Sequence, residues 1–165
     1  MARKRAKKLL VLTALLALGS LSSKIQVQAG ERVPMTHGGA IPGVVLSQTT
    51  VTAKHQPVRT VTLTKQEFTL TCDHPDYNGF PHVREWITDT VDGEGTLQGY
   101  YATYRPGGAS DNWGRLEGTI TKDAKGNTVL RGRWWHLGGT GKFKNLRSEG
   151  TFDSSGWQGW FEVIQ

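Results

Sequence analysis

Three titratable side chains in this sequence could do acid–base chemistry: Glu85, Tyr101 and His136. A carboxyl group in an apolar cavity has a raised pKa and can act as an acid or a base, with a histidine as its partner. A tyrosine can offer its phenol to a ligand oxygen. If the protein is an enzyme, these three residues are its expected catalytic groups. The alternative is that hydrogen bonds satisfy Glu85 and His136 at a rim, while Tyr101 packs in the core.

The cysteine and histidine spacing gives little support for a metal site. Cys72 is the single cysteine, so the chain cannot form an internal disulfide. Cys72, His74 and His82 have a C-x-H-x7-H spacing that fits no zinc pattern, because paired zinc ligands normally recur at two to four residues. The glycine run at residues 138–141 lacks the Gly-Lys-Ser/Thr ending of a phosphate-binding loop. We therefore expect no metal and no cofactor.

The residues that could do chemistry lie on short β-rich runs separated by turn clusters. Gly, Asn, Asp and Pro in these clusters supply the backbone angles that hairpins need, and no part of the body shows a sustained helical period. The sequence therefore predicts an all-β domain over residues 44–165. The expected strands are 44–54, 58–72, 83–91, 96–105, 115–122, 128–137, 147–153 and 158–164.

Five of the expected strands carry a central glycine after a polar residue. Glycine inside a strand costs stability, and tight bending or close approach is the usual reason for it. The glycine face is apolar and carries Leu97, Tyr101, Leu116, Ile120, Leu130, Trp134, Phe152, Trp157, Phe161 and Val163. The opposite face carries Gln98, Glu117, Thr119, Arg131, Arg133, Glu149, Thr151, Gln158 and Glu162. This pattern predicts a single antiparallel barrel of about eight strands, with a sandwich that has glycines at bulges as the alternative.

The same alternation predicts which side chains would line the barrel interior. We expect Tyr101, Trp134, His136 and Phe161 to form the ligand-binding surface. In strand 83–91 the aliphatic residues Val83, Ile87 and Val91 share a face with Glu85, so Glu85 is expected to point inward as well.

The first thirty residues are typical of a secretory signal peptide. A basic start is followed by an apolar run at residues 9–19, which is shorter than the roughly 20 residues of a membrane-spanning helix. We expect cleavage before Gly30, a flexible lead-in over residues 30–43, a secreted or periplasmic location and no stable membrane insertion. Six of the 20 Lys and Arg residues precede Gly30 and none of the 14 acidic residues does. The mature chain is therefore formally neutral, and nothing in its charge calls for nucleic acid.

The segment Gly138-Gly139-Thr140-Gly141-Lys142-Phe143, with Leu146 and Gly150 after it, resembles a known signature. It is similar to the signature of the allene oxide cyclase and dirigent-like barrels, a calycin-like group with small secreted bacterial members. The resemblance covers residues 95–163. In these families the phenylalanine of the turn enters the barrel end, and a glycine follows five residues later; here that position is Ser148. The resemblance implies an eight-stranded barrel with an apolar cavity, and often a homotrimer.

Three functions fit these observations. The first is a non-catalytic module that binds a small apolar ligand in a central cavity. The second is a cofactor-free cyclase or isomerase that folds a flexible hydrophobic substrate in the same cavity. The third is a structural protein with a solidly packed interior. A cavity of a few hundred Å³ would favour the first two, and an inward carboxylate near another polar group would favour the second.

Overall fold

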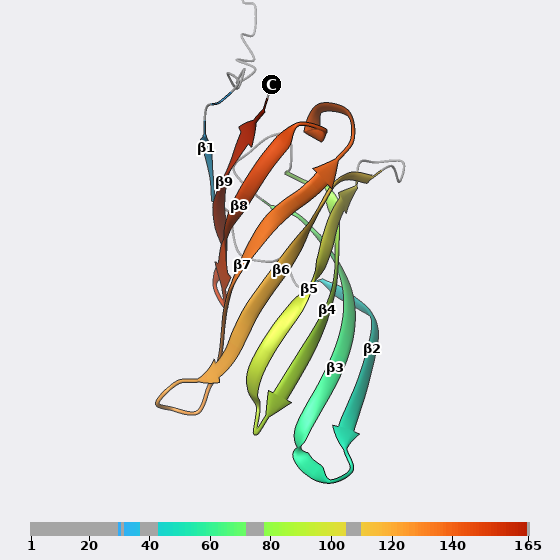
Figure 1. Ribbon diagram of the computed structural model, residues 1–165, viewed down its shortest axis with the longest axis vertical. Helices are drawn as coiled ribbons and strands as arrows, with labels where there is room; N and C mark the ends of the chain where they lie inside the picture. Colours follow the sequence, from blue (N-terminus) through green and yellow to red (C-terminus); the bar gives the residue numbers. More distant parts are fainter. Residues whose placement is uncertain (1–29, 31, 37–42, 72–77, 105–109, 165) are drawn as a thin grey trace, which may run out of the picture.

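The computed structural model describes residues 30, 32–36, 43–71, 78–104 and 110–164 (Figure 1). These residues form one antiparallel sheet of nine strands with the order β1-β9-β8-β7-β6-β5-β4-β3-β2. A short 3-10 helix, Gly141–Phe143, links β7 to β8. The strands are β1 (Val33–Thr36), β2 (Val44–Ala53), β3 (Gln56–Thr69), β4 (Pro81–Val91), β5 (Glu94–Tyr104), β6 (Ser110–Lys122), β7 (Thr128–Gly139), β8 (Leu146–Asp153) and β9 (Gly156–Val163). No helix within these ranges has the length and hydropathy of a membrane span.

The expected all-β antiparallel architecture is confirmed, but the expected closed barrel is wrong. Strands β2 to β9 follow one another as a meander, and β1 returns to pair with β9. Strands β1 and β2 are thus the two edges of an open, strongly curved sheet (Figure 1). The edges approach each other at one end of the molecule, because Met35 of β1 and Leu70 just after β3 line the same small cavity.

The expected flexible lead-in at residues 30–43 contains a strand. Residues 33–36 pair with residues 158–161 of β9, and Met35 is buried in the core. Pro34 has no backbone N–H, but an edge strand tolerates this because one side of it makes no ladder bonds. The burial of Met35 therefore stabilises this segment even though its composition resembles that of a loop.

The expected separation of two faces is confirmed in β5 to β9. The side chains of the glycine face are buried or pack against the buried cluster, whose members include Leu97, Leu116, Trp134, Phe152 and Phe161. The charged side chains of the opposite face are exposed or half-buried. We call the glycine face of the whole sheet its inner face and the opposite face its outer face.

The central glycines make room for aromatic rings on the inner face. A Cβ added to Gly132 would lie 2.6 Å from Cε1 of Phe152, and one added to Gly150 would lie 2.7 Å from Cε2 of Trp134. Both separations are far below van der Waals contact, so a larger residue would displace these rings. An added Cβ would also overlap the Glu117 carbonyl oxygen at Gly132 and the Gln158 carbonyl oxygen at Gly150. The glycines therefore allow close approach of both aromatic rings and neighbouring strands.

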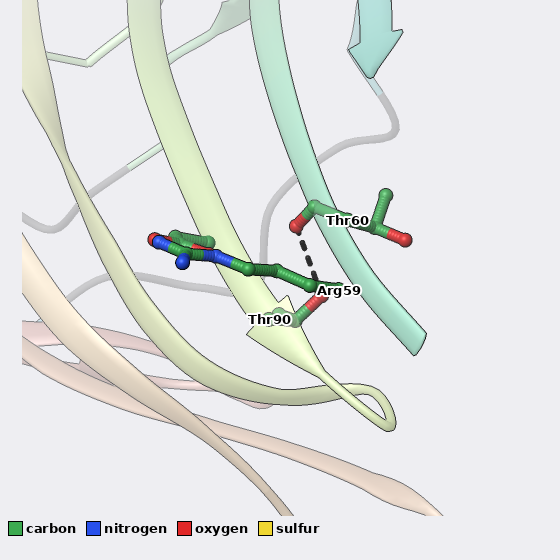
Figure 2. Close-up of polar contacts among 4 residues, drawn as sticks. Arg59, Thr60 and Thr90 are labelled. Atoms are coloured by element: carbon green, nitrogen blue, oxygen red, sulfur yellow. Dashed lines mark hydrogen bonds and ion pairs between the residues drawn. The ribbon is translucent and has the colours of Figure 1, made fainter. Parts of the chain in front are cut away.

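In the wing formed by β2 to β4, the half next to the β2–β3 and β4–β5 turns has the opposite polarity, whereas Phe68 and Trp86 lie farther from these turns and pack with the inner cluster. The inner face of that half carries a threonine array, in which Thr50 and Thr62 are 3.1 Å apart between their hydroxyl oxygens. The Thr90 hydroxyl donates to the Thr60 carbonyl over 3.3 Å, and Figure 2 shows the Thr60 side chain leaving β3 opposite to that of Arg59. The outer face of the wing carries exposed aliphatic residues: Val51, Val61, Leu63, Ile87 and Val91. An inner face of hydroxyls offers little apolar surface to bury, which accounts for a sheet that stays open on this side.

The turn after β7 buries Phe143, which is 4% exposed. The Thr140 N–H donates to the Asp111 carbonyl over 2.8 Å, and the Phe143 N–H donates to the Thr140 carbonyl over 3.0 Å. The burial expected for this phenylalanine is confirmed, and Phe143 belongs to the core while Thr140 and Gly141 are exposed.

Candidate functional site

Inner-face side chains of β3, β4 and β9 meet around the guanidinium of Arg84. The Arg84 Cζ atom lies 4.3 Å from the ring centroid of Phe68, 5.1 Å from that of Trp157 and 5.6 Å from that of Trp86. Cation–π attraction of this kind is strongest where water is excluded. Three rings from three strands therefore hold one cationic group inside the curved sheet.

The electrostatic environment of Arg84 is unusual because no anion among the described residues balances its charge. One Nη2–H donates to Oε1 of Gln66 over a long 3.4 Å, and the buried Nε–H has no hydrogen-bond partner. Within the described ranges no carboxylate forms an ion pair with Arg84. Burial lowers the pKa of Arg84 from 12.5 to about 10. The group stays charged at neutral pH, and the lowered pKa corresponds to a cost of about 3 kcal/mol for the charged form in the folded state.

A half-buried guanidinium with an unpartnered Nε–H is well suited to receive an oxyanion. Its planar fork of N–H donors matches a carboxylate or phosphate in bidentate geometry. An oxyanion at the terminal nitrogens would supply the missing charge partner, and it would reach the buried Nε–H only if the neighbouring side chains moved. Arg84 therefore resembles the cationic group of an anion-binding site, where the ligand balances the charge and accepts the hydrogen bonds.

Tyr101 lies beside Arg84 in one transverse row of the sheet. Register pairs Arg84 with Tyr101, Tyr101 with Gly114, and Gly114 with His136. The Tyr101 ring crosses Gly114, where a Cβ would meet its Cζ and hydroxyl atoms. Burial raises the pKa of Tyr101, so its phenol is protonated at neutral pH.

His136 points toward the inner face, as expected. It is half-buried, and neither ring nitrogen has a hydrogen-bond partner. Burial lowers the pKa of His136, so the imidazole is neutral at pH 7. Its place in the row of Arg84 and Tyr101 puts three polar groups of different chemistry on one line across the sheet.

Trp134 and Phe161 are also on the inner face, but they belong to a dense core. They are 4% and 3% exposed, and the Trp134 ring lies 6.3 Å from Tyr101 and 6.1 Å from Trp157 between centroids. A cavity of about 30 Å³ remains, lined by Asn112, Trp134, Tyr101 and neighbouring residues. This space has the size of about one water molecule, well below the roughly 300 Å³ at which small-molecule pockets begin.

Glu85 lies on the outer face, so its expected inward orientation is wrong. Its carboxylate pairs with Lys65 Nζ at 2.6 Å. The physical reason lies in the β4–β5 hairpin, whose turn residues Asp92 and Gly93 both have positive φ angles of 53° and 81°. This two-residue turn pairs Arg84 with Tyr101, and cross-strand partners share a face. The aliphatic face that carries Glu85 must therefore point outward.

Sequence reasoning missed Arg84 and Trp86, although a signal for them exists. An Asp-Gly pair between two β runs is a strong signal for a two-residue hairpin loop. If Asp92 and Gly93 form the two-residue loop, counting outward from the loop along both strands pairs Arg84 with Tyr101. Because Leu97 and Tyr101 are expected to point inward, Trp86 and Arg84 are then expected to point inward as well. The alternation of Val83, Ile87 and Val91 gave a period of two without showing which face is buried.

The other sequence candidates fall into two groups. Cys72 and His74 lie outside the described residues. His82 is buried, its Nδ1 lies 2.9 Å from the Thr103 hydroxyl, and its ring stacks on Tyr101 at 5.3 Å. No group of three or more potential metal ligands occurs within the described part of the chain.

Three comparisons place the chain against known proteins. No family model, no curated protein and no solved structure matches it. The resemblance to the allene oxide cyclase and dirigent-like barrels therefore stays a prediction from the residues of one turn.

Proposed function

We propose that this protein binds a small molecule with an apolar body and an acidic group. The acid lies at Arg84, and the body packs against the half-buried rings of Trp86 and Trp157. The observation that carries the proposal is the charged Arg84, held among three aromatic rings with an unpartnered Nε–H.

The acidic group of the ligand follows from the energetics of burial. A buried charge without a partner destabilises a fold, and a hydrophobic residue of similar volume is often neutral or stabilising in its place. Arg84 therefore costs stability in the free protein. An anionic ligand reverses this cost, because it forms charge-assisted hydrogen bonds with the guanidinium.

The ligand body lies on the inner face rather than in an enclosed chamber. The cavity beside Tyr101 and Trp134 holds about 30 Å³, which is too small for an organic ligand. Trp86, Trp157 and Arg84 each keep part of their surface exposed, and β2 is an edge of the sheet. The hydroxyls of the threonine array border this edge.

A cofactor-free cyclase or isomerase stays the alternative function. Tyr101 and His136 share the row of Arg84, and both are neutral at pH 7, so they could donate or accept hydrogen bonds without altering charge. Glu85 pairs with Lys65 on the outer face and takes no part. The binding proposal needs only Arg84 and the rings, and we prefer it for that reason.

Export and assembly complete the proposal. We infer that residues 1–29 direct secretion and are removed, so that the binding module acts outside the cytoplasm. A homotrimer stays a prediction of the family resemblance. Mass analysis of the exported chain and its native mass spectrum would test both, and a retained ligand would appear in the same spectrum.

Matched acids and alcohols test the function directly. We expect decanoate and cinnamate to bind at least about tenfold more tightly than decanol and cinnamyl alcohol, because only the acids can pair with Arg84. Titration calorimetry, or quenching of Trp86 and Trp157 fluorescence, measures this ratio. Arg84→Met should abolish the preference while keeping or raising stability, by up to about 3 kcal/mol.

Two controls complete this experiment. Arg131→Met removes an exposed outer-face arginine and should leave the acid preference unchanged. Equal binding of acids and alcohols by the wild-type protein, or an undiminished preference in a folded Arg84→Met variant, would contradict the proposal. Thermal unfolding of each variant establishes that loss of binding is not loss of fold.

A further inference from the structure

The outer face of β5 to β9 carries a second arrangement that the inner site does not use. One transverse row contains Tyr100, Arg115, Trp135, Glu149 and Trp160, each the register partner of the next. Aromatic residues thus occupy β5, β7 and β9, and charged residues occupy the strands between them. We propose that this row binds a neutral, extended polysaccharide.

The spacing of the aromatic residues fits a chain of sugar rings. Neighbouring strands are about 4.8 Å apart, so aromatic residues on alternate strands are separated by about 9.6 Å, close to the span of two pyranose rings in an extended chain. The faces of pyranose rings are rich in C–H bonds and pack against the negative faces of aromatic rings. A polysaccharide that crosses the strands would therefore meet an aromatic platform at a regular interval.

The row lies along a run of shallow hollows. One hollow of about 280 Å³ is lined in part by Tyr100, Arg115 and Gln98. A second of about 600 Å³ shares Gln98 and extends to Arg133, and a third of about 460 Å³ continues from Arg133 to Trp135 and Trp160. The first and third hollows contain residues of the row, whereas the second contains none of them and lies beside the row. We call the three neighbouring hollows together the trough.

The charge of the trough indicates a neutral ligand. The charged residues that line its hollows are three arginines and three glutamates: Arg115, Arg131, Arg133, Glu85, Glu117 and Glu149. A polyanion needs an excess of cationic side chains along its track, and this trough has none. Arginine, glutamate and glutamine side chains instead offer paired donors and acceptors to vicinal hydroxyl groups.

The rings are held in place before any ligand arrives. Arg115 and Arg133 lie 5.6 and 5.3 Å from the Trp135 ring centroid, and Arg133 also pairs with Glu117 at 2.6 Å. Tyr100 is 59% exposed. Arg32 and Arg147 lie 4.1 and 5.8 Å from the Trp160 centroid. Arginines over a ring cover part of its face, so we expect Tyr100 to contribute most, Trp135 less and Trp160 least.

Affinity electrophoresis with soluble neutral polysaccharides tests the proposal. The full mature chain is run in gels that contain hydroxyethylcellulose, xylan or glucomannan, and we expect at least one of these to retard it. Tyr100→Ala and Trp135→Ala should each weaken the interaction about fivefold or more, as expected of a truncated interface aromatic. Trp135→Tyr should restore binding, because it restores an aromatic platform.

Matched variants show whether binding depends on the aromatic row itself. Trp113→Ala removes a 39% exposed tryptophan outside the row and should leave retardation unchanged, as should Arg84→Met at the inner site. Retardation by none of the neutral polysaccharides would overturn the proposal, as would tighter, salt-sensitive binding of heparin or single-stranded DNA. An equal loss in Trp113→Ala would also overturn it, since the row would then have no special role.

Discussion

The strands β5 to β9 and the outer half of the wing, residues 48–52, 60–64 and 87–91, belong to one continuous sheet, yet they orient their apolar residues on opposite faces. In β5 to β9 the apolar side chains point inward and form the buried cluster. In the wing the inner face carries threonines, and the outer aliphatic residues Val51 and Leu63 are 61% and 51% exposed. The comparison shows that the backbone hydrogen bonds of a sheet can continue without interruption although its apolar side chains switch from the inner face to the outer face.

The inner site lies where these two regions meet. Strand β4 brings Arg84 and Trp86 to the inner face, and its neighbour β5 supplies Tyr101. The threonines of the wing offer polar groups, and the aromatic surface comes from both regions: Phe68 and Trp86 from the wing and Trp157 from β9. A ligand with an acidic group and an apolar body suits such a boundary better than it suits either region alone.

The largest expected difference between the regions is the cost of truncating an apolar side chain. Phe152→Ala should lower the free energy of unfolding by about 3–5 kcal/mol, because Phe152 is buried over Gly132 and its loss leaves a cavity. Leu63→Ala in the wing should change it by less than about 0.5 kcal/mol, because Leu63 is exposed. Denaturant unfolding measures both. Similar costs for the two variants would mean that the wing also buries its outer face.

The next largest effect tests why the strands β5 to β9 contain central glycines. Gly132→Ala should cost about 1–3 kcal/mol, since the new methyl group would overlap the Phe152 ring. In the Phe152→Ala background the same substitution should cost less, because the ring has been removed, and the remaining cost reports the close Glu117 carbonyl oxygen. A double-mutant cycle from thermal or denaturant unfolding gives the coupling. Additive costs would show that Gly132 serves the close backbone contact and not ring approach.

The smallest expected effect concerns pH and the inner row. Burial lowers the pKa of His136, so the unfolded chain, with an ordinary histidine pKa of about 6.5, binds the proton at higher pH than the folded one. The contribution of His136 to stability is therefore present above pH ~6.5 and is lost as the pH falls below it. Unfolding of His136→Gln between pH 7.5 and 5.5 should show a shallower loss of stability than wild type. The exposed His55→Gln is the control, and an unchanged slope in His136→Gln would contradict the burial argument.

Much of the fold can be predicted from the sequence because its signals are local. The expected strand 128–137 appears as Thr128–Gly139 and the expected strand 147–153 as Leu146–Asp153. The inward set around Leu116 and Trp134 follows from alternation and the central glycines. For the candidate site, Tyr101, Trp134, His136 and Phe161 were expected inside and lie there.

The sequence by itself determined where strands and turns occur and which residues share a face, because turn chemistry and a period of two act over a few residues. Only the tertiary structure decided which face of β4 is buried, since that depends on register against β5. It also decided that the sheet stays open, that residues 33–36 join it, and that Arg84 lies among Phe68, Trp86 and Trp157. These outcomes depend on contacts between residues far apart in the chain, and such contacts leave no periodic pattern in any one segment.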